Sequence, residues 1–320
     1  MGSHILLSLS LVGWIFAWSV PVRAAEQWPL QVVLYWEGHG LDEPNLEALE
    51  KLRIAYPELT LSHLINPSYF LDGELSESNL SAFNRVLKPD DEVGLYLSSI
   101  QPLIELANIR MRFQPTFWGH LDDREICQKD CGLDVPLSGR TREELLRLFS
   151  SADSALKQAG FRDMKTFAAR GWLGNRLLQT IAQSFAYNRD LTALDPRLLS
   201  PKLRAFPFYR WAKDRWDEEA SLTVPEIASF ASSRVTQGGT LDFNEASEII
   251  ARFDKVNPAL KPFQIALSQE TAYFSSRRLQ SVLKNLKEKA EQKDAQLLYQ
   301  TASDTKNGRP IADPRHISKL

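Results

Sequence analysis

The sequence predicts an α/β protein whose strands form a (β/α) barrel, distorted or incomplete, of about seven strands. Apolar runs of strand length alternate with amphipathic segments along most of the chain, which is typical of a parallel sheet. The chain has 320 residues, 43% of them hydrophobic, which is enough for one large core. An open, doubly wound parallel sheet is the alternative, although no glycine-rich phosphate loop follows the first apolar run.

The first half of the chain shows this alternation clearly. Residues 31–36 form an apolar run that stops at Glu37, and Pro44 then opens a helix with leucines at helical spacing. The elements expected after this helix are strands at residues 59–65, 91–97 and 110–117, and a helix at residues 77–87.

A long connection and further alternating elements follow. Residues 118–139 show little periodicity, and loops of that length in a compact domain are usually functional or disordered. Thr141 and Glu144 have the spacing of a capping box, and Gly160 ends the helix that they begin. The later elements are expected at residues 165–169 (strand), 175–185 (helix), near 187 (strand), from 223 (helix), after 239 (strand), after 244 (helix), 262–267 (strand) and 275–293 (helix).

The N-terminus indicates export. Residues 5–20 are apolar but too few to span a bilayer comfortably, and Val22 and Ala24 fit the small-residue rule for signal peptidase. We therefore expect residues 1–24 to be a secretory signal, residues 25–300 to form a single domain in the periplasm or outside the cell, and residues 301–320 to form a polar tail. An uncleaved anchor is the alternative, and only in that case do we expect contact with a membrane.

Composition narrows the choice of partner. The formal net charge is -2, so there is no basic excess to neutralise phosphates, and we expect no nucleic-acid partner. The eight tryptophans are more informative, because several lie beside polar strand ends, where flat rings commonly stack on sugars. Most tryptophans in a globular protein nevertheless contribute to the core.

The two cysteines, Cys127 and Cys131, lie in the long connection. In an exported protein such a pair most simply forms a disulfide. The alternative is a zinc site that combines the two thiolates with His120, but the spacing matches no recognised zinc pattern.

Four segments carry a resemblance to a known family. They are Tyr35-Trp36-Glu37-Gly38, Asp91-Glu92-Val93-Gly94-Leu95-Tyr96, Phe167-Ala168-Ala169-Arg170-Gly171-Trp172, and residues 263–267 followed by Ser268-Gln269-Glu270. In this order they resemble the strand-end motifs of the polysaccharide deacetylases, within the glycoside hydrolase/deacetylase superfamily. The resemblance covers roughly residues 31–290.

This resemblance implies a distorted (β/α) barrel that removes acetyl groups from glycans. In the family, a divalent metal held by one aspartate and two histidines activates water, and a further aspartate acts as base. Glu37 falls at the position of the base, and Arg170 matches the family arginine. The metal-ligand positions fall on residues that cannot replace a carboxylate or an imidazole, namely Gly38, Tyr96, Ile100 or Gln101, and Ser268.

We therefore expect no metal cofactor. The alternative is a divalent metal such as zinc on a rebuilt site, for which His39, His63 and His120 are the available imidazoles. His63 lies inside an apolar strand, where a histidine satisfied within the core is the simpler interpretation.

The candidate site residues lie at predicted strand ends. Glu37 is the foremost candidate for acid–base chemistry, with His39 beside it, and Asp190 or Glu270 is the candidate second carboxylate that glycoside cleavage requires. Glu37 could instead organise loop amides or pair with Arg170. The candidates for substrate binding are Trp36, Asn66, Trp118, His120, Arg170 and Trp172.

Together these features predict an exported, carbohydrate-active protein that acts on cell-wall or extracellular polysaccharide, including peptidoglycan-type glycan. The reaction would be hydrolysis by carboxylates or deacetylation. The alternative is a deacetylase-like pseudoenzyme that binds a glycan or a protein partner without catalysis.

Overall fold

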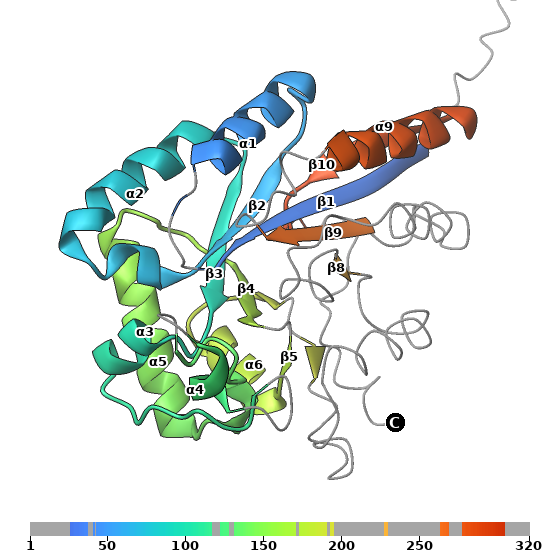
Figure 1. Ribbon diagram of the computed structural model, residues 1–320. Helices are drawn as coiled ribbons and strands as arrows, with labels where there is room; N and C mark the ends of the chain where they lie inside the picture. Colours follow the sequence, from blue (N-terminus) through green and yellow to red (C-terminus); the bar gives the residue numbers. More distant parts are fainter. Residues whose placement is uncertain are drawn as a thin grey trace, which may run out of the picture.

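The computed structural model describes the following residues: 26–37, 41, 43–116, 122–127, 131–170, 173–190, 193–194, 227–229, 263–268 and 277–304. Figure 1 shows most of the described strands in one twisted, curved sheet with helices packed along it. The predicted signal segment, the helix after residue 244 and most of the tail lie outside the described residues.

The main sheet is parallel throughout its described pairings. Its order is β6-β4-β3-β2-β1-β9-β8, and β10 pairs with β1 outside this path. The strands are β1 (Glu26–Trp36), β2 (Leu61–Ile65), β3 (Glu92–Leu97), β4 (Thr166–Ala169), β6 (Arg189–Asp190), β8 (Ile227–Ser229), β9 (Phe263–Ser268) and β10 (Ala295–Gln300).

The strand order distinguishes a barrel from a doubly wound sheet. From β1 the chain proceeds through β2, β3, β4 and β6 in one direction, and the late strand β9 returns to the other side of β1. A doubly wound sheet instead reverses direction at a switch point in the middle of the chain. The single direction of this order and the curvature of the sheet confirm the predicted distorted or incomplete (β/α) barrel (Figure 1).

Helices cover the outer face of this sheet (Figure 1). They are α1 (Glu43–Ala55), α2 (Gly73–Val86), α3 (Gln101–Leu106), α4 (Asp123–Ile126), α5 (Arg142–Gln158), α6 (Arg176–Ser184) and α9 (Arg277–Gln292), with 3-10 turns η1 (Pro67–Phe70) and η2 (Leu137–Gly139). Two short strands, β5 (Leu173–Gly174) and β7 (Ala193–Leu194), form a separate parallel pair.

Aromatic side chains fill the space between the sheet and these helices. The ring of Phe167 on β4 lies 5.1 Å from that of Phe149 on α5, and Trp36 on β1 lies 4.4 Å from Phe83 on α2. All four residues are at most 1% exposed. Burial of such rings is the main stabilising term that holds the helices against the sheet.

The predicted capping box is confirmed. The Thr141 hydroxyl accepts a hydrogen bond from the Glu144 amide at 3.3 Å, and the Glu144 carboxylate accepts one from the Thr141 amide at 2.8 Å. Both satisfy donors that the first turn of α5 would otherwise leave free.

Two predicted elements are wrong. Residues 110–115 form no strand, and Thr116 makes only an isolated bridge; in this segment Arg140 donates to the Arg110 carbonyl, and the Arg112 side chain pairs with Glu144 at 2.8 Å. The helix expected from residue 223 is also wrong. The described part of this segment, residues 227–229, forms β8, which pairs with β9.

The sequence analysis also missed β10. This strand pairs with the first half of β1, and the turn after it closes the N-terminal end of the sheet. In that turn, the Ala302 amide donates to the Ser62 hydroxyl at 2.7 Å, and the Ser303 amide donates to Glu92 at 3.0 Å. Residues 301–304 of the expected polar tail are therefore bonded to the sheet.

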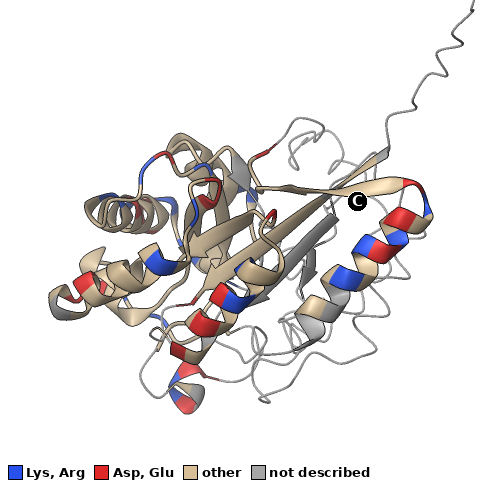
Figure 2. Cartoon of the chain, turned by 90° about the horizontal axis from the view of Figure 1, so that it is seen from above, with Lys and Arg blue, Asp and Glu red and all other residues tan. Residues whose placement is uncertain are grey.

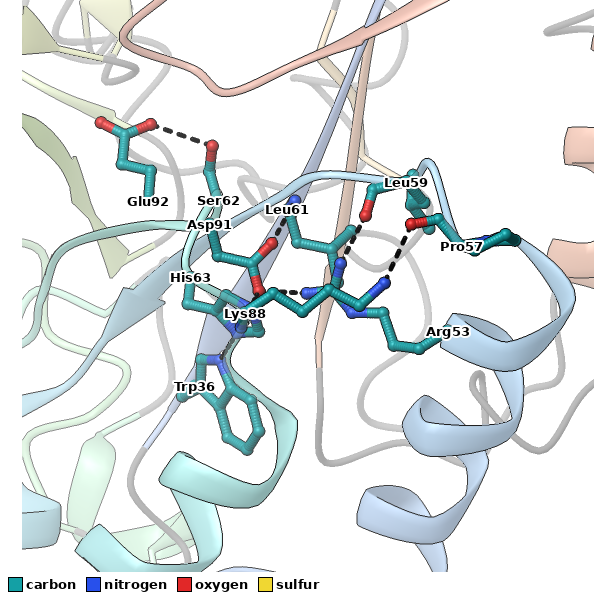
Figure 3. Close-up of polar contacts among 10 residues, drawn as sticks. All are labelled: Trp36, Arg53, Pro57, Leu59, Leu61, Ser62, His63, Lys88, Asp91 and Glu92. Carbon is teal, nitrogen blue, oxygen red and sulfur yellow. Dashed lines mark hydrogen bonds and ion pairs between the residues drawn. The ribbon is translucent and has the colours of Figure 1, made fainter.

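A buried carboxylate, Asp91, links the elements on the outer face of β2 and β3 (Figure 3). It pairs with Arg53 at the end of α1 and accepts from the amides of Leu61 at 2.9 Å and Lys88 at 2.8 Å. Burial by itself would raise the pKa of Asp91, but His63, Arg53 and the Lys88 amide hold that pKa below its ordinary value. One ionised side chain therefore joins a helix, a strand and a turn.

Charged residues of both signs are spread along the helices, whereas the strands carry few (Figure 2). On α9, for example, Lys284 and Glu288 form an exposed pair at 3.7 Å. No helix among the described residues has both the length and the apolar character needed to cross a bilayer.

We predict that Asp91→Asn lowers the free energy of unfolding by about 3–5 kcal/mol, because it leaves the Arg53 charge buried without its counterion. Urea denaturation followed by circular dichroism measures this. Glu47→Gln is the control, because it breaks the exposed pair of Glu47 with Lys51, and its effect should stay within about 1 kcal/mol. Equal effects of the two substitutions would contradict the role given to Asp91.

Candidate functional site

The register of the sheet brings polar residues together where β1 to β4 end. Trp36 lies beside Ile65, Ile65 beside Leu95, and Leu97 beside Ala169. Continuing these pairings places Asn66 and Tyr96 in the row of Glu37, and Ser98 and Arg170 in a row two residues further along β3 and β4. The four residues at this edge are Glu37, Asn66, Ser98 and Arg170, and all are at most 7% exposed.

Glu37 and Arg170 form a buried ion pair. Arg170 Nη1 contacts Glu37 Oε1, and the two side chains are 8% and 4% exposed. The Tyr96 hydroxyl donates to the same oxygen at 3.4 Å. Burial of a carboxylate is costly unless it is paired and hydrogen-bonded, and both conditions hold here.

Arg170 also reaches a second carboxylate. Its Nη2 lies 3.2 Å from Oδ1 of Asp134, whose side chain is 20% exposed. The guanidinium therefore bridges Glu37, at the end of β1, and Asp134, in the long connection before η2. A planar fork with several N–H donors suits this geometry.

Asn66 ties three strand ends to one another. Its Nδ2 donates to the Ser98 hydroxyl at 2.7 Å and to the Glu37 carbonyl at 3.1 Å, while its own amide donates to the Trp36 carbonyl at 3.0 Å. Asn66 is fully buried, and its Oδ1 accepts from the Ser68 amide at 3.1 Å. Its contacts are those of a residue that fixes the strand ends.

The predicted disulfide between Cys127 and Cys131 is present, with 5.0 Å between the Cα atoms. The Cys131 carbonyl accepts from the Gln101 amide at 2.9 Å, and Gly132 follows with φ +88 against the Ser99 carbonyl, where a Cβ atom would lie 2.1 Å from that oxygen. Only glycine fits this position. These contacts attach the loop that carries Asp134 to the end of β3.

Asp123 lies under this loop. Its carboxylate accepts a hydrogen bond from the Gly132 amide, and the residue is 1% exposed. Burial raises the pKa of Asp123, and the nearby charge of Asp134 adds to the increase. The pKa of the neighbouring Asp122 shifts in the opposite direction, because hydrogen bonds from Arg124 lower it to about 2.

The described residues do not fit the metal site that the family resemblance implies. Tyr96 donates its hydroxyl to Glu37, Ile100 is 1% exposed in the core, and exposed Gln101 bonds Glu105 at 2.7 Å. The one described group with metal-ligand spacing is Asp123, Cys127 and Cys131, and its sulfurs are joined in the disulfide.

His63 belongs to the core, as the simpler interpretation predicted. Its Nδ1 accepts from Trp36 Nε1 at 3.2 Å, which assigns the proton of the neutral ring to Nε2, 3.4 Å from Asp91 Oδ2 (Figure 3). Burial lowers the pKa of His63. His63 therefore faces the helices and cannot join a metal site at the strand ends. His39 and His120 lie outside the described residues.

The other predicted residues divide into three groups. Trp36 is wrong as a sugar-binding wall, because its ring is 1% exposed and packs on Phe83 and His63. Asp190 is placed by its backbone alone, beside Phe167 in the register of β4 and β6. Trp118, Trp172 and Glu270, like His39 and His120, lie outside the described residues.

The sequence analysis did not identify Tyr96 as the hydrogen-bond donor to Glu37, nor Asp134 as the second carboxylate on Arg170. Tyr96 entered only as a substituted metal-ligand position, although its place one residue before the end of an apolar strand was a usable signal. Asp134 lies in a loop without periodicity, and no local pattern distinguishes it from the neighbouring acidic residues.

Comparisons with known proteins give distant structural similarities. A family 4 carbohydrate esterase from Streptomyces lividans in complex with acetate aligns with a TM-score of 0.43 and 9% identity, over 88% of this chain and 98% of that one. The CE4 domain of a multidomain xylanase from a Trinervitermes trinervoides hindgut metagenome gives a TM-score of 0.40 and 8% identity, over 90% and 95% of the two chains.

A CE4 family pseudoenzyme from Bacillus anthracis aligns with a TM-score of 0.45 and 8% identity, over 82% of this chain. This chain spans 62% of the length of that pseudoenzyme, and 65% of a mutant of it with restored enzymatic activity. The sequence matches no family model and no curated protein.

Proposed function

We propose that this protein binds polysaccharide at the C-terminal ends of β1 to β4 and that it does not deacetylate or cleave the glycan. The observation that carries the proposal is that the Glu37 carboxylate is already occupied by contacts within the protein. This carboxylate is buried and paired with Arg170, and it accepts a hydrogen bond from Tyr96. The glycan itself is inferred from the sequence resemblance to polysaccharide deacetylases.

The surroundings of Glu37 argue against both catalytic alternatives. Deacetylation by the family route needs a dication beside the carboxylate, and the described neighbours of Glu37 are an arginine, a tyrosine and an asparagine. Glycoside cleavage needs a second carboxylate across an open groove. The second carboxylate described here, Asp134, is held by the same guanidinium as Glu37.

The proposal includes export of this protein from the cytoplasm. A glycan outside the cytoplasm requires the predicted signal at residues 1–24, and the disulfide between Cys127 and Cys131 is of the kind that persists in an oxidising compartment. N-terminal sequencing of the exported protein should begin at Ala25; an uncleaved N-terminus would contradict the signal.

We predict that the mature protein leaves N-acetylated glycan oligomers chemically unchanged while it binds them or a related glycan. Mass spectrometry after incubation, with and without added divalent metal, measures loss of acetyl groups and shortening of the chain. Affinity electrophoresis with a panel of cell-wall and plant polysaccharides measures binding in the same preparation.

The outcomes separate the alternatives. Metal-dependent loss of acetyl groups would mean that a rebuilt metal site exists, and shortened oligomers would indicate hydrolysis. If oligomers are shortened, Glu37→Gln should abolish that activity with the fold intact. Unchanged oligomers together with no retardation by any polysaccharide would contradict glycan binding.

A further inference from the structure

Arg140 is a buried arginine whose guanidinium is only partly hydrogen-bonded. Its side chain is 0% exposed, and its Nη1 donates to the Arg110 carbonyl at 2.6 Å and lies 3.6 Å from Oε1 of Glu144. The other two nitrogens, Nε and Nη2, are buried and have no hydrogen-bond partner among the described residues. Together Nε and Nη2 form the side-on edge of the guanidinium, whose two N–H groups match two oxygens of one oxyanion.

This edge is costly to leave without an acceptor. A buried donor that lacks a partner costs about 1–3 kcal/mol, and more when the group is charged. Native proteins therefore satisfy most of their buried polar groups, and an exception calls for a specific explanation, such as a bound water molecule or ion. The side-on edge of Arg140 is an exception of this kind.

The carboxylate beside Arg140 is shared with a second arginine. Oε2 of Glu144 pairs with Arg112 Nη2 at 2.8 Å and also accepts from the Thr141 amide at 2.8 Å. The cluster of Arg112, Arg140 and Glu144 therefore combines two positive charges with one negative charge. Because the whole chain has a formal net charge of -2, this positive excess is a local feature.

The first turn of α5 adds to the positive character of this cluster. Thr141 is the N-cap of the helix, which has 17 residues, and Glu144 lies in its first turn. The amides of Arg142 and Glu143 are among the first four of the helix, which have no acceptor within it. The aligned peptide dipoles place about half a positive charge at this end. The guanidinium edge, the excess charge and the helix end therefore all favour an anion.

The surroundings of the buried edge extend to the surface. The Arg112 side chain is 33% exposed, and Gly139 and residues 141–143 are exposed. Arg112 donates to the Gly139 carbonyl, and exposed side chains change rotamer within picoseconds to nanoseconds. A compact oxyanion therefore needs only a local side-chain movement to reach Arg140.

We propose that Arg140, together with Arg112 and the first turn of α5, forms a binding site for a compact oxyanion of the phosphate type. The oxyanion accepts two hydrogen bonds from Nε and Nη2 of Arg140 and compensates the excess positive charge. Two sources offer this chemistry, namely free inorganic phosphate and a phosphoryl group on a sugar. The site uses none of the strand-end residues, and the inference does not depend on the proposed glycan-binding function.

The test is isothermal titration calorimetry of the mature, disulfide-bonded protein at about 0.15 M salt, where exposed charges more than about 8 Å apart are largely screened. The probes are inorganic phosphate and glucose 6-phosphate. We expect saturable binding of one phosphate per chain, and a loss of affinity of about tenfold or more in Arg140→Lys, which keeps the charge but not the planar edge. Glucose 6-phosphate distinguishes the two sources, because it matches inorganic phosphate only if the site accepts a sugar-borne group.

The matched control is Arg147→Lys, the same exchange at an exposed position of α5 that donates to the Asn108 carbonyl, and it should leave the phosphate affinity unchanged. Circular dichroism confirms that each variant is folded. The inference is overturned if phosphate shows no saturable binding, as expected if water satisfies the edge, or if Arg140→Lys binds phosphate like the unmodified protein. If Arg140→Lys does not fold, NMR of the unmodified protein decides: phosphate should shift the Nε–H resonance of a solvent-protected arginine, and an unchanged spectrum overturns the inference.

Discussion

The parallel register of β1 to β4 is the constraint on which the strand-end site depends. Because Trp36, Ile65 and Leu95 form one row, the residues that follow them reach the same edge of the sheet. The next strand pair, Leu97 beside Ala169, brings Ser98 and Arg170 to that edge as well. A slip of one residue in any pairing would turn Glu37 or Arg170 toward the helices and separate the ion pair.

The chain uses two buried carboxylate–arginine pairs on opposite faces of this sheet. On the outer face, Asp91 with Arg53 joins α1 to the start of β2 and β3. At the strand ends, Glu37 with Arg170 joins β1 to β4, and Asp134 extends the pair to the disulfide loop. In each pair the carboxylate accepts a further hydrogen bond besides its contact with arginine, and this offsets part of the cost of burying it.

Much of the architecture could be predicted, because long apolar runs and strong helix signals determine it locally. Thr141 and Glu144 fixed the start of α5, and the run before Glu37 marked β1. The errors share one feature, which is contact with a segment from another part of the chain. Arg140 donates to the Arg110 carbonyl, Glu144 pairs with the Arg112 side chain, and β10 depends on an edge that β1 supplies from the other end of the chain.

The site was predicted in part for a similar reason. Glu37, Asn66 and Arg170 follow buried strands, so their convergence was foreseeable from the alternation of strands and helices. The pairing of Glu37 with Arg170 was one alternative among several, and the sequence could not choose it, because the choice depends on register. Trp36 immediately precedes Glu37 and therefore points to the opposite face, into the core, so its role was misassigned.

The most direct test of this account is a double-mutant cycle on Glu37 and Arg170, measured as free energies of unfolding in urea. Glu37→Gln, Arg170→Met and the double variant keep the side-chain volumes nearly constant. A structural ion pair predicts a coupling energy of about 1.5–3 kcal/mol, with the double variant more stable than the sum of the single losses implies. Additivity within about 0.5 kcal/mol would contradict it, and would mean that Glu37 is free of Arg170 and available for chemistry.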